Sequence, residues 1–111
     1  MSLNIKEKYG LLINNEWVPA SDGAEFAVYN PANGDQLAIC AEATQSDVDK
    51  AVEVATEAFK TWKHVSQVDR ADYLLKIADA IDAHKEHLAQ VETYDNGKPI
   101  RETLNVDIPL G

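Results

Sequence analysis

Residues 44–62, TQSDVDKAVEVATEAFKTW, hold the longest regular pattern in the chain. Thr44 with Asp47, or Ser46 with Asp49, has the spacing of a helix capping box with Asp as its acid. The stretch therefore predicts an amphipathic helix that begins close to Thr44. Its apolar residues recur three and four positions apart, on one helix face, and they are Val48, Ala51, Val52, Ala55, Ala58, Phe59 and Trp62.

A second helix follows after a linker of three or four residues around positions 63–65. Ser66 with Asp69 repeats the capping spacing, and the helix is expected to run to Glu92 or Thr93. Because the linker is short, we expect the two helices to be neighbours and roughly antiparallel. The apolar residues expected to point inward are Ala71, Leu74, Leu75, Ala78, Ile81, Leu88 and Val91.

The second helix is expected to end at Tyr94-Asp95-Asn96-Gly97, where Gly97 suits the left-handed conformation beyond a helix end. Pro99 stands where the first turn of a new helix tolerates proline. A short third helix is then predicted, since apolar residues recur four apart at Ile100, Leu104 and Ile108.

Two short β-hairpins are predicted ahead of the helices. Residues 11–13 and 17–18 are apolar and flank Asn14, Asn15 and Glu16, and asparagine tolerates the positive φ of a tight turn. The second hairpin has strands over residues 26–29 and 37–41, joined by a turn at 30–35. Two such hairpins are marginal alone and need a partner surface. The fold class predicted is thus α+β, with residues 1–43 rich in strands and residues 44–111 helical.

The charge balance excludes some classes of partner. Nineteen acidic and ten basic residues give the 111-residue chain a net charge of −9, which disfavours binding to nucleic acid and to anionic membranes.

The single cysteine, Cys40, rules out an intrachain disulfide. The opening MSLNIKEKYG lacks the apolar run of a signal peptide, and no apolar stretch approaches ~20 residues. We therefore expect a cytoplasmic protein.

No residue pattern in the chain predicts catalysis. The five glycines, at positions 10, 23, 34, 97 and 111, are too far apart to form a phosphate-binding loop. Cys40 stands in an apolar strand, where a free cysteine packs as a small hydrophobic residue. His84 and His87 are three positions apart and could reach one ion, but no nearby third ligand completes a site. No catalytic and no cofactor-binding residue is assigned.

The turn before the third helix carries a resemblance. Glu92-Thr93 followed by Asp95-Asn96-Gly97-Lys98-Pro99 resembles the ETxDNGKP stretch of the aldehyde dehydrogenase superfamily. Other stretches follow in that family's order, so the resemblance covers about residue 11 to the end. The run 98–103 is similar to bacterial members of the family that act on small aliphatic aldehydes. These stretches are residues 13–18, 30–34, 47–52, 58–62 and 70–78.

The resemblance implies an amino-terminal piece of an NAD(P)-dependent aldehyde dehydrogenase, a single incomplete domain over residues 1–111. In that family the catalytic cysteine, the general-base glutamate and the glycine-bearing cofactor loop lie downstream of this piece, as does the hairpin used in assembly. The parent would oxidise an aldehyde through a thiohemiacetal, pass hydride to NAD or NADP, and hydrolyse the resulting thioester. The 111 residues alone are expected to bind no cofactor and to be inactive.

Two sets of site residues follow from the resemblance alone. In some family members the backbone matching Val28 and Tyr29, with the carboxylate matching Asp95, helps to hold a monovalent cation. The family also implies that Val106 and Leu110 line the tunnel through which the aldehyde enters.

The chain also fits a second function class. It would then be a stand-alone remnant that acts as an oligomerising or protein-binding helical module without catalysis. The expected helical pair would expose an apolar face, and isolated apolar surface of that kind tends to be buried by self-association. The expected partners are therefore the remainder of a dehydrogenase chain, or further copies of this one.

Overall fold

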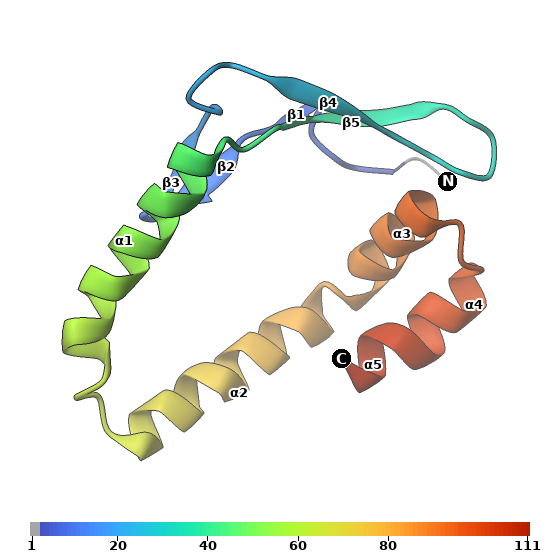
Figure 1. Cartoon of the computed structure of the whole chain (residues 1–111). Helices are drawn as coiled ribbons and strands as arrows, with labels where there is room; N and C mark the ends of the chain where they lie inside the picture. The colour runs from blue at the N-terminus through green and yellow to red at the C-terminus, as the bar shows by residue number, and fades with distance from the viewer. Residues whose placement is uncertain (1–2) are drawn as a thin grey trace.

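The computed structural model describes residues 3–111, and along these residues the strands precede the helices (Figure 1). The α+β class predicted from the sequence is confirmed. The strands are β1 (Lys8–Tyr9), β2 (Leu11–Ile13), β3 (Glu16–Val18), β4 (Glu25–Tyr29) and β5 (Gln36–Ala41). The helical segments are α1 (Gln45–Trp62), α2 (Gln67–Ala83), α3 (Lys85–Asn96), α4 (Ile100–Glu102), the π-helical turn η1 (Thr103–Asp107) and α5 (Ile108–Leu110).

The first predicted hairpin is formed by β2 and β3. The two strands pair antiparallel with Leu12 opposite Trp17. Asn14 and Asn15 both have positive φ, at 54° and 61°, as the tight two-residue turn requires.

The second hairpin, β4 with β5, gains a third strand that the sequence did not predict. β1 pairs parallel to β5, so the sheet has the order β1-β5-β4. Gly10 lies between β1 and β2, where a Cβ atom would stand 2.7 Å from the carbonyl oxygen of Val18. Only glycine allows the chain to leave one sheet and enter the other so close to β3.

The start of α1 is tied to the loop that follows β3. Thr44 and Asp47 form the capping box, which decides between the two pairs that the sequence offered. The carboxylate of Asp47 accepts hydrogen bonds from the backbone N–H of Thr44 at 2.9 Å and of Ser21 at 3.1 Å. Hydroxyl contacts of Ser21 with Thr44 and Ser46 add to this link. The helix therefore has a defined position relative to the hairpin β2–β3.

The expected antiparallel packing of the first two helices is wrong. In Figure 1, α1 and α2 diverge from their short linker instead of lying side by side. Neither helix contains a buried residue. The rings of Trp62 and Tyr73 make an edge contact at the corner, with centroids 5.3 Å apart. Leu74 and Leu75, expected to point inward, are 68% and 65% exposed, because no described element covers them.

The predicted second helix is in fact two helices. It breaks at His84, whose φ of −111° and ψ of 13° are not helical. The N–H of His84 is shared between the carbonyls of Ala80 and Ile81, and its ring Nδ1 lies 2.8 Å from the Ala80 carbonyl oxygen. Because the chain turns here, α3 packs on the terminal helix while α2 extends away (Figure 1).

The third helix forms as predicted, with an irregularity. Residues 100–110 are helical throughout, but η1 is a π-helical turn in which Ile108 bonds back to the carbonyl of Thr103. Pro109 lacks an N–H and crowds the preceding turn, so a wider turn before it relieves the helix. The segment packs on α3, and Thr103 from η1 and Ala89 from α3 are both 0% exposed.

The described residues enclose little interior. Their radius of gyration is 17.1 Å, whereas a compact domain of this length has about 13 Å. The buried side chains are all small, and they are Ala20, Asn30, Ala38, Ala89 and Thr103. Among residues 3–111, no helix is long and apolar enough to cross a membrane.

Candidate functional site

A cavity of about 190 Å³ lies between the β1-β5-β4 sheet and α3. Val28 from β4 and Asp95 from the last turn of α3 both line it. Tyr29 is not among the lining residues, and its side chain is exposed. The full lining is Leu3, Ile5, Tyr9, Val28, Leu37, Ala38, Cys40, Val91 and Asp95.

The β-ladder is irregular beside this cavity. Val28 is opposite Ala38, whereas Tyr29 is opposite Gln36, so Leu37 is the extra residue of a bulge. A bulge disrupts the ladder locally and leaves its extra residue, here Leu37, without a regular backbone partner.

Asp95 is positioned by the turn that ends α3. Gly97 caps the helix with φ of 80°, and its Cα lies against Pro31 in the turn between β4 and β5. The side chain of Asn96 accepts a bond of 2.8 Å from the N–H of Lys98 and donates one of 2.6 Å to Glu92. This turn therefore holds the Asp95 carboxylate, which is exposed, at the edge of the cavity.

The chemistry of the cavity is limited. Asp95 is its one carboxylate, and most of the other lining residues are apolar. Cys40 is half-buried in β5, where it packs as a small apolar residue. Within residues 3–111, no three His, Cys, Asp or Glu side chains gather as a metal site. The cavity therefore offers one carboxylate, that of Asp95, in a largely apolar lining.

The two residues predicted for the tunnel lie on the terminal helical segment. Val106 is 41% exposed and Leu110 80% exposed, so both are available to line a surface. The segment is anchored by Lys98, whose Nζ lies 2.5 and 2.7 Å from the carboxylate oxygens of Asp107. The hydrogen bond with Asp107, together with its negative charge, raises the pKa of Lys98 above the usual value for lysine.

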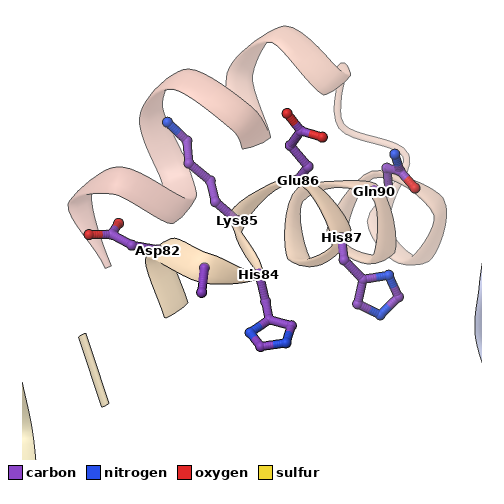
Figure 2. Close-up of a pocket in the computed structure, with 7 residues that line it drawn as sticks. Asp82, His84, Lys85, Glu86, His87 and Gln90 are labelled. Atoms are coloured by element: carbon purple, nitrogen blue, oxygen red, sulfur yellow. The ribbon is translucent and has the colours of Figure 1, made fainter. Parts of the chain in front are cut away.

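The histidine pair lies outside this site, at the junction of α2 and α3. Figure 2 shows His84 and His87 directed to the same side of the junction, with Lys85 and Glu86 directed elsewhere. Both histidines are exposed. A structural zinc site usually has four ligands, and the described part of the chain brings no third His or Cys to this pair.

The sequence did not reveal two contacts that position the site. The hydroxyls of Thr93 and Thr103 are 2.8 Å apart and join α3 to the terminal segment. Pro31 and Gly97 meet across the gap between the sheet and α3. The only available signal was that residues 30–34 and 95–99 are both turn motifs of the family resemblance, and turn composition does not identify a partner.

Comparison with known proteins identifies one family that this chain matches. The model of the "Aldehyde dehydrogenase family" matches residues 17–111. DhaS of Bacillus subtilis, a proposed aldehyde dehydrogenase, is 48% identical over 102 residues, which are 90% of this chain and 21% of DhaS. Acetaldehyde dehydrogenase of Pseudomonas aeruginosa is 44% identical over 108 residues, covering 97% of this chain and 21% of that enzyme.

Solved structures give the same result. The NAD⁺ complex of an aldehyde dehydrogenase from Bacillus cereus superposes with a TM-score of 0.89 at 43% identity, over 96% of this chain and 22% of that one. Betaine aldehyde dehydrogenase from Staphylococcus aureus, also with NAD⁺, gives a TM-score of 0.91 at 30% identity, over 98% of this chain and 22% of that one. The chain thus spans about a fifth of the length of these relatives.

Proposed function

Since the chain belongs to the aldehyde dehydrogenase family, we propose that it serves as the amino-terminal segment of a cytoplasmic NAD(P)-dependent enzyme that oxidises an aldehyde to a carboxylic acid. The observation that carries the proposal is the superposition on the Bacillus cereus enzyme, which covers nearly all of this chain and about a fifth of that one. The catalytic residues would lie in the remainder of the enzyme, and this segment would pack against that remainder.

The character of α2 supports a role inside a larger protein. Its large apolar side chains form a wide face, and a face of this kind normally packs against a protein core. Here these residues are open to solvent, as Val68, Tyr73, Leu74, Leu75 and Ile77 are each more than half exposed. In the longer enzyme, the remainder of the chain would cover them.

The cavity beside α3 is proposed to contribute to a monovalent cation site. The Asp95 carboxylate and the backbone oxygens near Val28 and Tyr29 would supply part of the ligand set. The bulge at this point of the ladder and the position of Asp95 at the cavity edge support the assignment. Further oxygen ligands would come from the remainder of the longer enzyme.

Val106 and Leu110 are proposed to form part of the wall of the aldehyde tunnel. They are four residues apart on the terminal helical segment, and both are exposed and apolar. The cofactor is proposed to be NAD or NADP, bound by the longer enzyme. The solved Bacillus cereus and Staphylococcus aureus enzymes are complexes with NAD⁺.

A chimera tests the proposal. The 108 matched residues of the Pseudomonas aeruginosa acetaldehyde dehydrogenase would be replaced by the corresponding residues of this chain. We expect acetaldehyde-dependent reduction of NAD or NADP by the chimera, and none by the 111-residue chain alone or by the relative without its matched segment. A chimera that is soluble and folded by circular dichroism, yet inactive, would overturn the proposed role.

A further inference from the structure

Two asparagines of the sequence are followed directly by glycine, at Asn33-Gly34 and at Asn96-Gly97. Glycine has no side chain to shield its backbone nitrogen, so an asparagine before it is prone to lose its side-chain amide. We propose that Asn33 is a site of spontaneous deamidation in this protein, and that packing protects Asn96 from the same reaction. The inference concerns the chemical stability of the segment and does not rest on the proposed enzymatic function.

The reaction joins the side chain of the asparagine to the backbone of the next residue. The backbone nitrogen of the glycine attacks Cγ of the asparagine, a new C–N bond forms, and the side-chain amide leaves as ammonia with the proton of the glycine N–H. Water then opens the cyclic imide at either carbonyl and gives aspartate or its β-linked isomer. The product carboxyl group is ionised at neutral pH, so the segment gains one negative charge.

The two sites have the same local structure. Gly34 and Gly97 both have φ of 80°. Each glycine N–H donates to the carbonyl four residues before it, that of Asn30 at 2.8 Å and that of Thr93 at 3.0 Å. In both sites Oδ1 of the asparagine accepts a bond from the N–H two residues later, at 3.0 and 2.8 Å. In both, Nδ2 donates to a nearby carboxylate, at 2.8 and 2.6 Å. Local hydrogen bonds therefore do not distinguish the sites.

The sites differ in what surrounds the glycine. Gly34 lies in the exposed turn between β4 and β5, and a Cβ atom built on it would have no atom within 4 Å. A Cβ atom built on Gly97 would lie 3.0 Å from Cγ of Pro31. Gly97 also ends α3, which packs on the terminal helical segment. The first glycine is thus free to move, whereas the second is held by a helix and by a neighbouring turn.

This difference decides how readily the imide ring closes. The glycine nitrogen needs to leave its hydrogen bond and rotate towards Cγ of the asparagine. At Gly34 the rotation disturbs an exposed turn only. At Gly97 it opens the last turn of α3 and disturbs the contact with Pro31, and packed elements open at a higher free energy than exposed turns. Asn33 should therefore react faster than Asn96 in the folded protein.

The modification would also alter the turn that contains it. The bond from Nδ2 of Asn33 goes to the carboxylate of Asp35. A second carboxylate at this position cannot donate a hydrogen bond, and the two negative charges repel each other. The modified turn between β4 and β5 should therefore be less stable than the original one.

The test measures deamidation at each asparagine in the chimera with the Pseudomonas aeruginosa enzyme. The folded chimera is incubated in mildly alkaline buffer, and peptide mapping by mass spectrometry gives the rate at each site. We expect Asn33 to react roughly tenfold or more faster than Asn96, because the end of α3 has to open first. The same protein unfolded in urea is the reference, and there the two rates should be similar, since glycine follows both asparagines.

Two variants separate packing from local chemistry. Pro31→Ala removes the atom closest to the Cβ position of Gly97 and should raise the rate at Asn96. Pro19→Ala is the matched control, because Pro19 is exposed in the loop after β3, and it should leave both rates unchanged. Circular dichroism checks that each variant is folded. If Pro31→Ala unfolds, the comparison of the folded and urea-unfolded chimera still decides.

Three results would each overturn the proposal. They are a rate ratio in the folded chimera equal to that in urea, an absence of deamidation at Asn33, and a folded Pro31→Ala variant with an unchanged rate at Asn96. Because the readout is mass and not activity, a folded but inactive chimera would count against the enzymatic role alone.

Discussion

Gly97 ends α3 directly against Pro31, so closely that a Cβ atom on Gly97 would lie 3.0 Å from Cγ of that proline. The contact joins the last turn of the helix to the turn between β4 and β5. It therefore fixes the height of Asp95 above the sheet, and with it the geometry of the proposed cation site.

Gly97→Ala should destabilise the chain for two reasons, its φ of 80° and the proximity of Pro31. Gly34 has the same φ but no atom within 4 Å of its Cβ position. Gly34→Ala should therefore cost about 1–2 kcal/mol for backbone strain alone, and Gly97→Ala should cost more. Urea unfolding followed by circular dichroism measures both. Equal costs would show that the contact with Pro31 contributes nothing.

Thr103→Val should cost about 1–2 kcal/mol, because it leaves the hydroxyl of Thr93 without its partner. Thr103 is fully buried, and its own hydroxyl also donates to the carbonyl of Ile100. Replacing both threonines by valine should recover part of the loss. The exposed Thr56→Val is the control, and an equal effect there would contradict the argument.

Acid should weaken the capping box of α1. Backbone N–H bonds from Thr44 and Ser21 hold the pKa of Asp47 below its ordinary value of 3.8. A depressed pKa stabilises the folded state above pH 3.8, and the effect disappears as the pH falls through the depressed value. The difference in unfolding midpoint between the unaltered chain and Asp47→Asn should therefore be constant near pH 7 and shrink below pH 3.8.

Asp49→Asn is the control for that titration, since the carboxylate of Asp49 accepts a hydrogen bond from the side chain of Gln45, one turn away in the same helix. Near neutral pH, the unfolding midpoint of Asp49→Asn should differ less from that of the unaltered chain than the midpoint of Asp47→Asn does. A difference for Asp47→Asn that did not change with pH would mean that the ionised carboxylate contributes nothing.

Alkali should act on the terminal segment through Lys98. Its pKa is raised above 10.5, chiefly by the hydrogen bond with Asp107. The stabilisation is therefore complete below pH 10.5 and is lost as the pH rises through the raised value. The unaltered chain should be more stable than Lys98→Met from pH 7 to 10, and the two should converge above that range.

Lys50→Met removes an exposed pair with Glu53 on α1 and serves as the matched lysine control. Such surface pairs contribute little, so its stability should stay close to that of the unaltered chain. If Lys50→Met lost as much stability as Lys98→Met, the effect would come from the removal of any positive charge and not from the pair of Lys98 with Asp107.

The local features of this protein were predictable because their determinants lie within a few residues of each other. The capping pair Thr44–Asp47, the turn at Asn14–Asn15 and the left-handed cap at Gly97 each depend on neighbouring backbone geometry. The identity of the family was also readable, since its motifs are contiguous stretches. The resemblance also named Val28, Tyr29 and Asp95 as one site, but the residues themselves gave no reason why these positions should lie together.

The tertiary structure alone decided how these pieces meet. The parallel pairing of β1 with β5, the break at His84 and the divergence of α2 from α1 have no local signal. The pairing of β1 with β5 joins segments far apart in the chain, as in Lys8 opposite Ile39, so neighbouring residues do not specify it. For the same reason, Val28 and Asp95 share one cavity only because a helix cap meets a strand turn at Gly97 and Pro31.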